Sequence, residues 1–150
     1  MSEGETESKT HADYVIALNT AQTEAEIQAV ASGLRAYNAS KAGPAEYENW
    51  GLYVRDNDGN IKGGLLAETG RGWLHISILW LDESLRGQGL GTQLMGRAEE
   101  EARKRGCHHV YLDTFDYQAR PFYEGLGYTV FGTLDDYPLG HQRFYLQKKL

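Results

Sequence analysis

The chain has 150 residues, and its 15 Lys and Arg against 21 Asp and Glu give a formal net charge of −6 at pH 7. This length predicts one domain with a sizeable core, and the acidic balance argues against a nucleic acid as the main partner while it suits a cationic substrate. The apolar stretches are too short to cross a membrane, and we expect no signal peptide in the polar start. The lone Cys107 is expected as a buried thiol. We therefore expect a cytoplasmic protein.

The start of the chain predicts a tail followed by one folded domain. Residues 1–13 contain no large apolar side chain after Met1 and cannot bury enough surface to offset the entropy of ordering. We therefore expect a flexible tail over 1–13 and a single domain over 14–150. That domain starts with a short apolar strand at 14–18.

A capping box starts the first predicted helix. Thr23 and Glu26 stand at the spacing that satisfies two main-chain N–H groups at a helix start, and the helical pattern is lost near 41–44. The remaining patterns predict a hairpin, a strand, a long amphipathic helix, a strand, a short helix and a last pair of strands. Their expected ranges are 52–55 with 61–68, 73–81, 90–105, 110–113, 122–126, and 128–132 with 143–148. Pro121 is best accommodated if the short helix starts near Arg120.

This order of elements predicts a mixed α/β fold. The strands 73–81 and 110–113 are joined through a helix, so we expect them to lie parallel. A glycine-rich turn, Arg-Gly-Gln-Gly-Leu-Gly-Thr at 86–92, then lies at the carboxyl end of a strand, where ligand sites of α/β proteins collect.

The turn at 86–92 has the residues of a phosphate-binding loop. Its glycines allow main-chain N–H groups to turn inward, and the helix that follows adds unsatisfied N–H groups and a positive dipole end. A dinucleotide-binding unit fits poorly, because the chain has one central crossover, and a Walker loop would need a lysine before Thr92. On the residues alone, a tight turn that binds nothing remains the alternative.

Two segments resemble the motifs of the GNAT family of N-acetyltransferases: ISILWLDESLRGQGLG at 76–91 and ARPFYEGLGY at 119–128. The resemblance covers about residues 14–150. It implies an acyl-CoA N-acyltransferase fold, with a mostly antiparallel sheet of six to seven strands, one parallel splayed pair, and about four helices. It also implies acetyl-CoA as cosubstrate, with the pyrophosphate on main-chain N–H groups of the turn and the pantetheine arm along the strand before it. The cofactor-binding residues that it implies are Leu79, Trp80, Leu81, Arg86, Gly87, Gln88, Gly89, Leu90, Gly91, Thr92 and Asp116. Asp116 stands where the family often has asparagine, and an ionised carboxylate accepts but does not donate.

The same resemblance implies catalytic residues. Tyr123 matches the family's general-acid tyrosine, which protonates the departing thiolate; its alternative is a tyrosine that packs in the core. His75 is the candidate base, since imidazole titrates in the useful range, with Glu68 or water as its rivals. His108 and His109 are adjacent, so on a strand they would point to opposite faces and could not share a metal, and we expect no metal site.

The acceptor is less defined by the sequence. Asp135 and Asp136 could attract an amine, or they could form an ordinary acidic turn. We expect a primary amine on a small molecule; a protein or peptide N-acetyltransferase and a non-catalytic acyl-CoA-binding module are the alternatives. No nucleic acid or membrane partner is expected, and both a monomer and a homodimer remain open.

Overall fold

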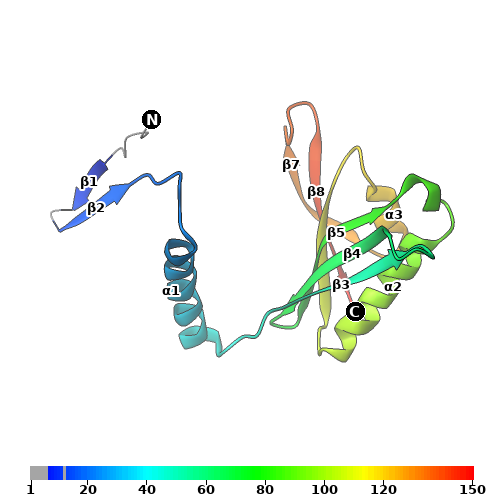
Figure 1. The fold of residues 1–150 in the computed structure, drawn as a ribbon, viewed down its shortest axis with the longest axis horizontal. Helices are drawn as coiled ribbons and strands as arrows, with labels where there is room; N and C mark the ends of the chain where they lie inside the picture. The colour runs from blue at the N-terminus through cyan, green and yellow to red at the C-terminus, as the bar shows by residue number, and fades with distance from the viewer. Residues whose placement is uncertain (1–6, 12) are drawn as a thin grey trace. The chain divides into compact units, whose positions relative to one another are not determined.

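The computed structural model describes residues 7–11 and 13–150, which divide into two compact units, Met1–Pro44 and Ala45–Leu150. The single domain over 14–150 stays a prediction of the sequence. In Figure 1 the described residues of the first unit are coloured blue to cyan, and the second unit runs from cyan through green and yellow to red. No helix within the described ranges is long and apolar enough to cross a membrane.

The first unit begins with two antiparallel strands, β1 (Glu7–His11) and β2 (Tyr14–Ala17). Strand β1 falls within the residues that were expected to be a flexible tail. Main-chain pairing with β2 accounts for the difference, because hydrogen bonds between strands do not require apolar side chains. The rest of the expected tail, apart from residue 13, lies outside the described residues.

Helix α1 (Glu24–Ala42) completes the first unit. The predicted capping box is confirmed: the Glu26 N–H donates to Thr23 Oγ1 at 3.2 Å, and the Thr23 N–H donates to Glu26 Oε1 at 3.0 Å. The helix ends at Ala42, and Gly43 is its C-cap residue. The φ of Gly43 is 79°, a backbone conformation that favours a residue without a side chain.

The second unit is built on a six-stranded sheet in the order β3-β4-β5-β6-β8-β7. Its strands are β3 (Glu48–Arg55), β4 (Ile61–Gly70), β5 (Trp73–Leu81), β6 (His109–Phe115), β7 (Thr129–Asp135) and β8 (Gln142–Lys149). The β5–β6 pair is parallel and the other pairs are antiparallel, which confirms the mixed α/β prediction and the parallel pair. Strand β8 lies between β6 and the edge strand β7, so the end of the chain is paired on both sides.

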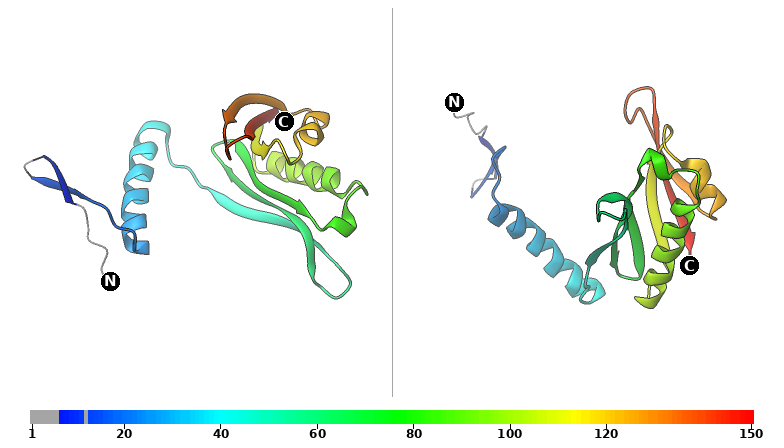
Figure 2. Two further views of the ribbon diagram at one scale, coloured as in Figure 1. Left: turned by 90° about the horizontal axis from the view of Figure 1, so that it is seen from above. Right: turned by 45° about the vertical axis from the view of Figure 1, so that its right-hand side comes forward.

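Helix α2 (Leu90–Lys104) lies along the sheet and contacts β4 and β5, while the short α3 (Arg120–Gly125) follows β6 (Figure 2). Helix α3 starts at Arg120 with Pro121 in its first turn, as predicted, because proline lacks the N–H that the first turn leaves unused. The core holds apolar side chains of alternate strand positions and of one helix stripe. They include Leu65, Leu74, Ile76, Leu94, Met95, Ala98, Ala102, Val110, Leu112, Phe144 and Leu146.

Strands β5 and β6 pair only over their first halves. Their register runs from Trp73 opposite His109 to Ile76 opposite Leu112 and then stops. On its other side, β5 pairs with β4 through a bulge at Ser77, whose hydroxyl donates to the Leu66 carbonyl at 3.2 Å. A bulge bends its strand, so the bend and the parting of β5 from β6 coincide.

Candidate active site

The glycine-rich turn between β5 and α2 presents main-chain donors. Gly87 and Gly89 have φ values of 75° and 79°, and Gly89 is the N-cap of α2. The N–H groups from Gly87 to Thr92 donate no hydrogen bond to another described residue. Side chains brace the turn instead: Arg86 Nε donates to the Leu81 carbonyl at 3.1 Å. Such a row of donors at a helix start suits a phosphate group.

A pocket of about 580 Å³ opens beside this turn. Its lining combines the turn with apolar side chains of β5 and the segment around α3: Leu79, Leu81, Arg86, Gly87, Gly89, Leu90, Gly91, Thr92, Ala119 and Phe122. At Gly91, an added Cβ would lie 3.3 Å from Phe122 Cζ, so α2 and α3 meet closely here. The donors for a pyrophosphate and the apolar wall for a pantetheine chain are both present, so these residues fit acetyl-CoA.

A second pocket of about 650 Å³ occupies the gap where β5 and β6 part. It shares Leu79, Leu81, Arg86 and Ala119 with the first pocket, so the two adjoin. Its further lining comes from the parted strands, the loop after β6, α3 and β8: Ser77, Ile78, Trp80, Asp113, Thr114, Phe115, Tyr117, Gln118, Tyr123 and Arg143. Two ligands that enter these pockets would meet near α3.

Tyr123 lies in this second pocket, as required of a catalytic acid. Its side chain is only 7% exposed, yet its hydroxyl makes no hydrogen bond to a described residue and is not among fully buried polar atoms, so it opens to the pocket. Burial, followed by the nearby charge of Asp113, raises the pKa of the Tyr123 phenol to about 12.

His75 and Glu68 lie away from Tyr123. They are paired across β4 and β5, and the His75 ring stacks on Tyr111 with centroids 4.5 Å apart. This is the half of β5 that still pairs with β6, so neither side chain lines the two pockets.

Of the other residues predicted to contact the cofactor, some line one of the two pockets and others do not. Trp80 lines the second pocket, whereas the side chain of Gln88 donates to the Ser84 carbonyl and lines neither pocket. Asp116, expected at the cofactor, instead accepts hydrogen bonds at 2.9 Å from the Gln142 N–H and from His141 Nδ1. It thereby ties the end of β6 to the start of β8.

Asp135 and Asp136 have local partners at the turn between β7 and β8. Asp135 Oδ1 accepts from the Gln142 side chain at 2.8 Å, and Asp136 Oδ1 accepts from the Gly140 N–H at 3.2 Å. Neither residue lines the two pockets. Their geometry is that of an acidic turn, which was the alternative reading of this segment.

The geometry predicted for the adjacent histidines is wrong. His108 precedes β6 rather than belonging to it, and its N–H donates to the Gly72 carbonyl at 2.8 Å. The alternation of a strand does not apply there, and the Nδ1 atoms of His108 and His109 lie 2.5 Å apart. Within the described ranges, no group of three or more His, Cys, Asp or Glu side chains could hold a metal ion.

An aspartate–arginine pair in the second pocket was not predicted from the sequence. Arg143 Nε on β8 donates to Asp113 Oδ2 on β6 at 2.7 Å, and its guanidinium carbon lies 5.3 Å from the Phe115 ring centroid and 4.9 Å from that of Tyr137. Asp113 was expected only as a strand end. The pair forms because β8 lies beside β6 in the sheet. No local sequence pattern predicts this strand order.

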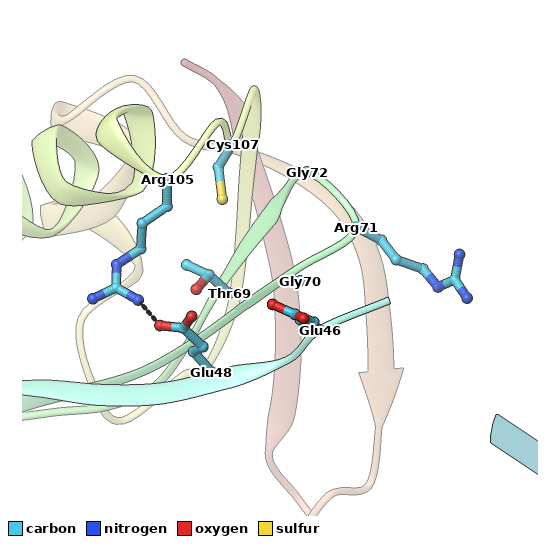
Figure 3. A pocket seen from close by; sticks show the side chains of 8 residues that line it. All are labelled: Glu46, Glu48, Thr69, Gly70, Arg71, Gly72, Arg105 and Cys107. Atoms are coloured by element: carbon cyan, nitrogen blue, oxygen red, sulfur yellow. Dashed lines mark hydrogen bonds and ion pairs between the residues drawn. The ribbon is translucent and has the colours of Figure 1, made fainter. Parts of the chain in front are cut away.

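A third hollow, of about 230 Å³, lies at the other end of β4 and β5 (Figure 3). The Arg105 guanidinium and the Glu48 carboxylate pair across it, and Arg71 points away. Cys107 is buried as predicted, and burial raises the pKa of its thiol. The hollow shares no lining residue with the two pockets at α3.

Residues 18–128 match the acetyltransferase (GNAT) family. An acetyltransferase of Agrobacterium fabrum is 38% identical over 131 residues, which cover 87% of this chain and 95% of the relative. The blasticidin-S acetyltransferase of Streptomyces morookaense is 38% identical over 104 residues, or 69% of this chain and 76% of the relative. The crystal structure of an acetyltransferase from Bacillus cereus matches with a TM-score of 0.80 and 33% identity, over 89% of this chain and 97% of that one. The chain therefore belongs to the GNAT family and is an acetyl-CoA-dependent N-acetyltransferase.

Proposed function

We propose that the protein transfers the acetyl group of acetyl-CoA to a primary amine on a small molecule, by direct attack in a ternary complex with Tyr123 as the acid. The observation that carries the proposal is the meeting of two pockets beside the Tyr123 phenol. One pocket has free main-chain donors and apolar walls, and the other has a carboxylate and aromatic rings.

The donor side is bound mostly through main chain. The N–H groups of Gly87 to Thr92 would hold the pyrophosphate, and the unpaired edge of β5 around Leu79 would take the pantetheine arm as an added strand. Acetyl-CoA supplies an activated acyl group on a thiol that can leave. Because the Leu81 carbonyl already accepts from Arg86, Leu79 is the better main-chain partner.

Tyr123 stays protonated at neutral pH, since the pKa of its phenol is raised to about 12. An ordinary thiol has a pKa of about 8.5, so complete proton transfer from this phenol to a thiolate would be uphill by about 5 kcal/mol. The Tyr123 hydroxyl therefore acts first as a hydrogen-bond donor to the developing negative charge. His75 and Glu68 lie outside the pocket, so we propose that water removes the proton of the amine.

The similarity to the blasticidin-S acetyltransferase of Streptomyces morookaense supports a small-molecule acceptor. Release of free thiol from acetyl-CoA, measured with blasticidin S, an aminoglycoside and a lysine-containing peptide, tests the class of acceptor. Turnover of a small amine supports the proposal. Turnover of the peptide alone would make the protein a peptide N-acetyltransferase, and CoA binding without any turnover would favour a binding module.

Tyr123→Phe tests the mechanism. We expect kcat to fall by about 10²- to 10⁴-fold, the range for loss of a general acid, while calorimetry finds the CoA affinity nearly unchanged. A variant as active as the parent would exclude Tyr123 as the acid.

A further inference from the structure

The second pocket, which lies where β5 and β6 part and is called the acceptor pocket from here on, has a single acidic side chain in its lining. Asp113 is that residue, and it stands directly after Leu112, the last β6 residue that pairs with β5. Its side chain therefore lines the gap where the two strands part. The pocket beside the glycine-rich turn has no acidic side chain in its lining.

Only one carboxylate oxygen of Asp113 is engaged. Oδ2 accepts the Arg143 Nε hydrogen bond at 2.7 Å, whereas Oδ1 accepts none from a described residue. Oδ1 is not among the fully buried polar atoms without a partner, so it is open to the pocket. The Asp113 side chain is 18% exposed, and an interaction with its charge is weakened less by solvent than one at the surface.

Arg143 holds Asp113 in place and is itself held by rings. Its guanidinium carbon lies within 5.3 Å of the ring centroids of Phe115, Tyr137 and Tyr145. A carboxylate anchored on one oxygen by such a group keeps its other oxygen oriented, and the ordering cost of binding a cation to it is small.

The same carboxylate lies near the catalytic phenol, because its charge is one of the two causes that raise the pKa of Tyr123. An ammonium group on Asp113 Oδ1 would therefore be held in the pocket where the reaction takes place. The other acidic candidates, Glu68, Asp116, Asp135 and Asp136, line neither pocket.

We propose that Asp113 binds the ammonium group of the acceptor through Oδ1, and that Arg143 positions Asp113 without contacting the amine. This inference rests on the proposed function and assigns the acceptor class: an amine that arrives as a cation and carries an apolar or aromatic group next to it. The aromatic side chains Phe115, Tyr117 and Trp80 would receive that group.

The test uses benzylamine as the probe, with benzyl alcohol as its uncharged counterpart, in NMR titrations of the full chain with and without CoA. In the parent, benzylamine should shift resonances of residues that line the acceptor pocket. Asp113→Asn should weaken benzylamine binding at least tenfold, equivalent to about 1.4 kcal/mol, and leave benzyl alcohol unaffected. Asp58→Asn, in the exposed turn between β3 and β4, is the matched control and should bind like the parent.

Arg143→Gln separates binding from structure. If Asp113 binds the ammonium and Arg143 only positions it, this variant keeps the carboxylate and weakens benzylamine binding by less than Asp113→Asn does. If Asp113 serves only as the partner of Arg143, both variants lose affinity equally, which overturns the proposal. Absence of benzylamine shifts in the pocket overturns it too. Should Asp113→Asn not fold, Arg143→Gln still decides: it should bind benzylamine more tightly than benzyl alcohol, and loss of that preference overturns the proposal.

The outcome is independent of the acetyltransferase reaction, because benzylamine binding needs no turnover. For an amine that the enzyme does acetylate, Asp113→Asn should raise the KM for the amine at least tenfold and leave the KM for acetyl-CoA unchanged. A fall in kcat with an unchanged amine KM would contradict the binding role.

Discussion

Raising the pH from 9 to 11 should lower the free energy of unfolding, because the Tyr123 phenol ionises more readily in the unfolded chain than in the folded one. The pKa of this phenol is about 12 in the folded chain, because burial disfavours the phenolate, and about 10 in an unfolded chain. Below pH 10 both states keep the proton, so Tyr123 adds no pH dependence there. Above pH 10 the unfolded chain loses the proton first, so it binds fewer protons and the free energy of unfolding falls as pH rises. At pH 11 the loss is about 1.4 kcal/mol, which corresponds to one pKa unit.

Urea unfolding at pH 9, 10 and 11 measures this loss in the parent and in Tyr123→Phe. From pH 9 to pH 11 the free energy of unfolding of the parent should fall by about 1.4 kcal/mol more than that of the variant. Ionisations of groups that do not contact Tyr123 act in both proteins and cancel. Tyr53→Phe is the control, because its side chain is 54% exposed, and it should keep the slope of the parent. Equal slopes for the parent and Tyr123→Phe would refute the assignment of a raised pKa to this phenol.

Two further predictions concern the turn and the core. Gly89→Val should weaken CoA binding, measured by calorimetry, because a β-branched side chain obstructs the approach to the main-chain N–H groups of the turn. Gly59→Val is the control, because Gly59 has a similar φ of 84° and lies far in sequence from the residues of the CoA pocket. It should lower stability and leave the CoA affinity unchanged. Lys148→Met should cost about 3 kcal/mol in urea unfolding at pH 7, since Lys148 Nζ lies 3.0 Å from both oxygens of the buried Glu99, which also accepts from Tyr128. A matching Glu99→Gln change should recover most of that loss, and an unchanged midpoint for Lys148→Met alone would contradict the reasoning.

Local features of this chain were predictable from sequence because their causes are local. The capping box of Thr23 and Glu26 depends on residues three apart, and the turn at 86–92 depends on glycines that adopt a left-handed backbone. The start of α3 at Arg120 follows from the ring of Pro121 alone. In each case the residue type determines the conformation within one turn of chain.

Features that depend on strand order were not predictable in this way. The strand order places β8 between β6 and β7, and this is what sets Arg143 beside Asp113. Asp116 matches the position of a family asparagine that contacts the cofactor, and that role stays a prediction; its hydrogen bonds to His141 and Gln142 at the start of β8 were not predicted. The error on the histidines has a local cause: β6 begins at His109, so His108 lies outside the strand, its side chain does not follow the alternation of strand residues, and it contacts His109.

The two halves of the site therefore respond differently to substitution. In the proposed function, the donor side would use main-chain groups of the turn and of β5, so a side-chain change there should act only by altering the backbone or by blocking the approach to it. On the acceptor side, we propose a role for the side chains of Asp113, Phe115 and Arg143, which line the pocket from strands whose register is held by main-chain hydrogen bonds. Changes at these three positions can alter which amine binds while β6 and β8 stay paired. Acceptor preference should consequently be open to redesign without loss of CoA affinity, whereas the reverse should fail, because both pockets share Leu79, Leu81 and Arg86 on the donor strand and turn.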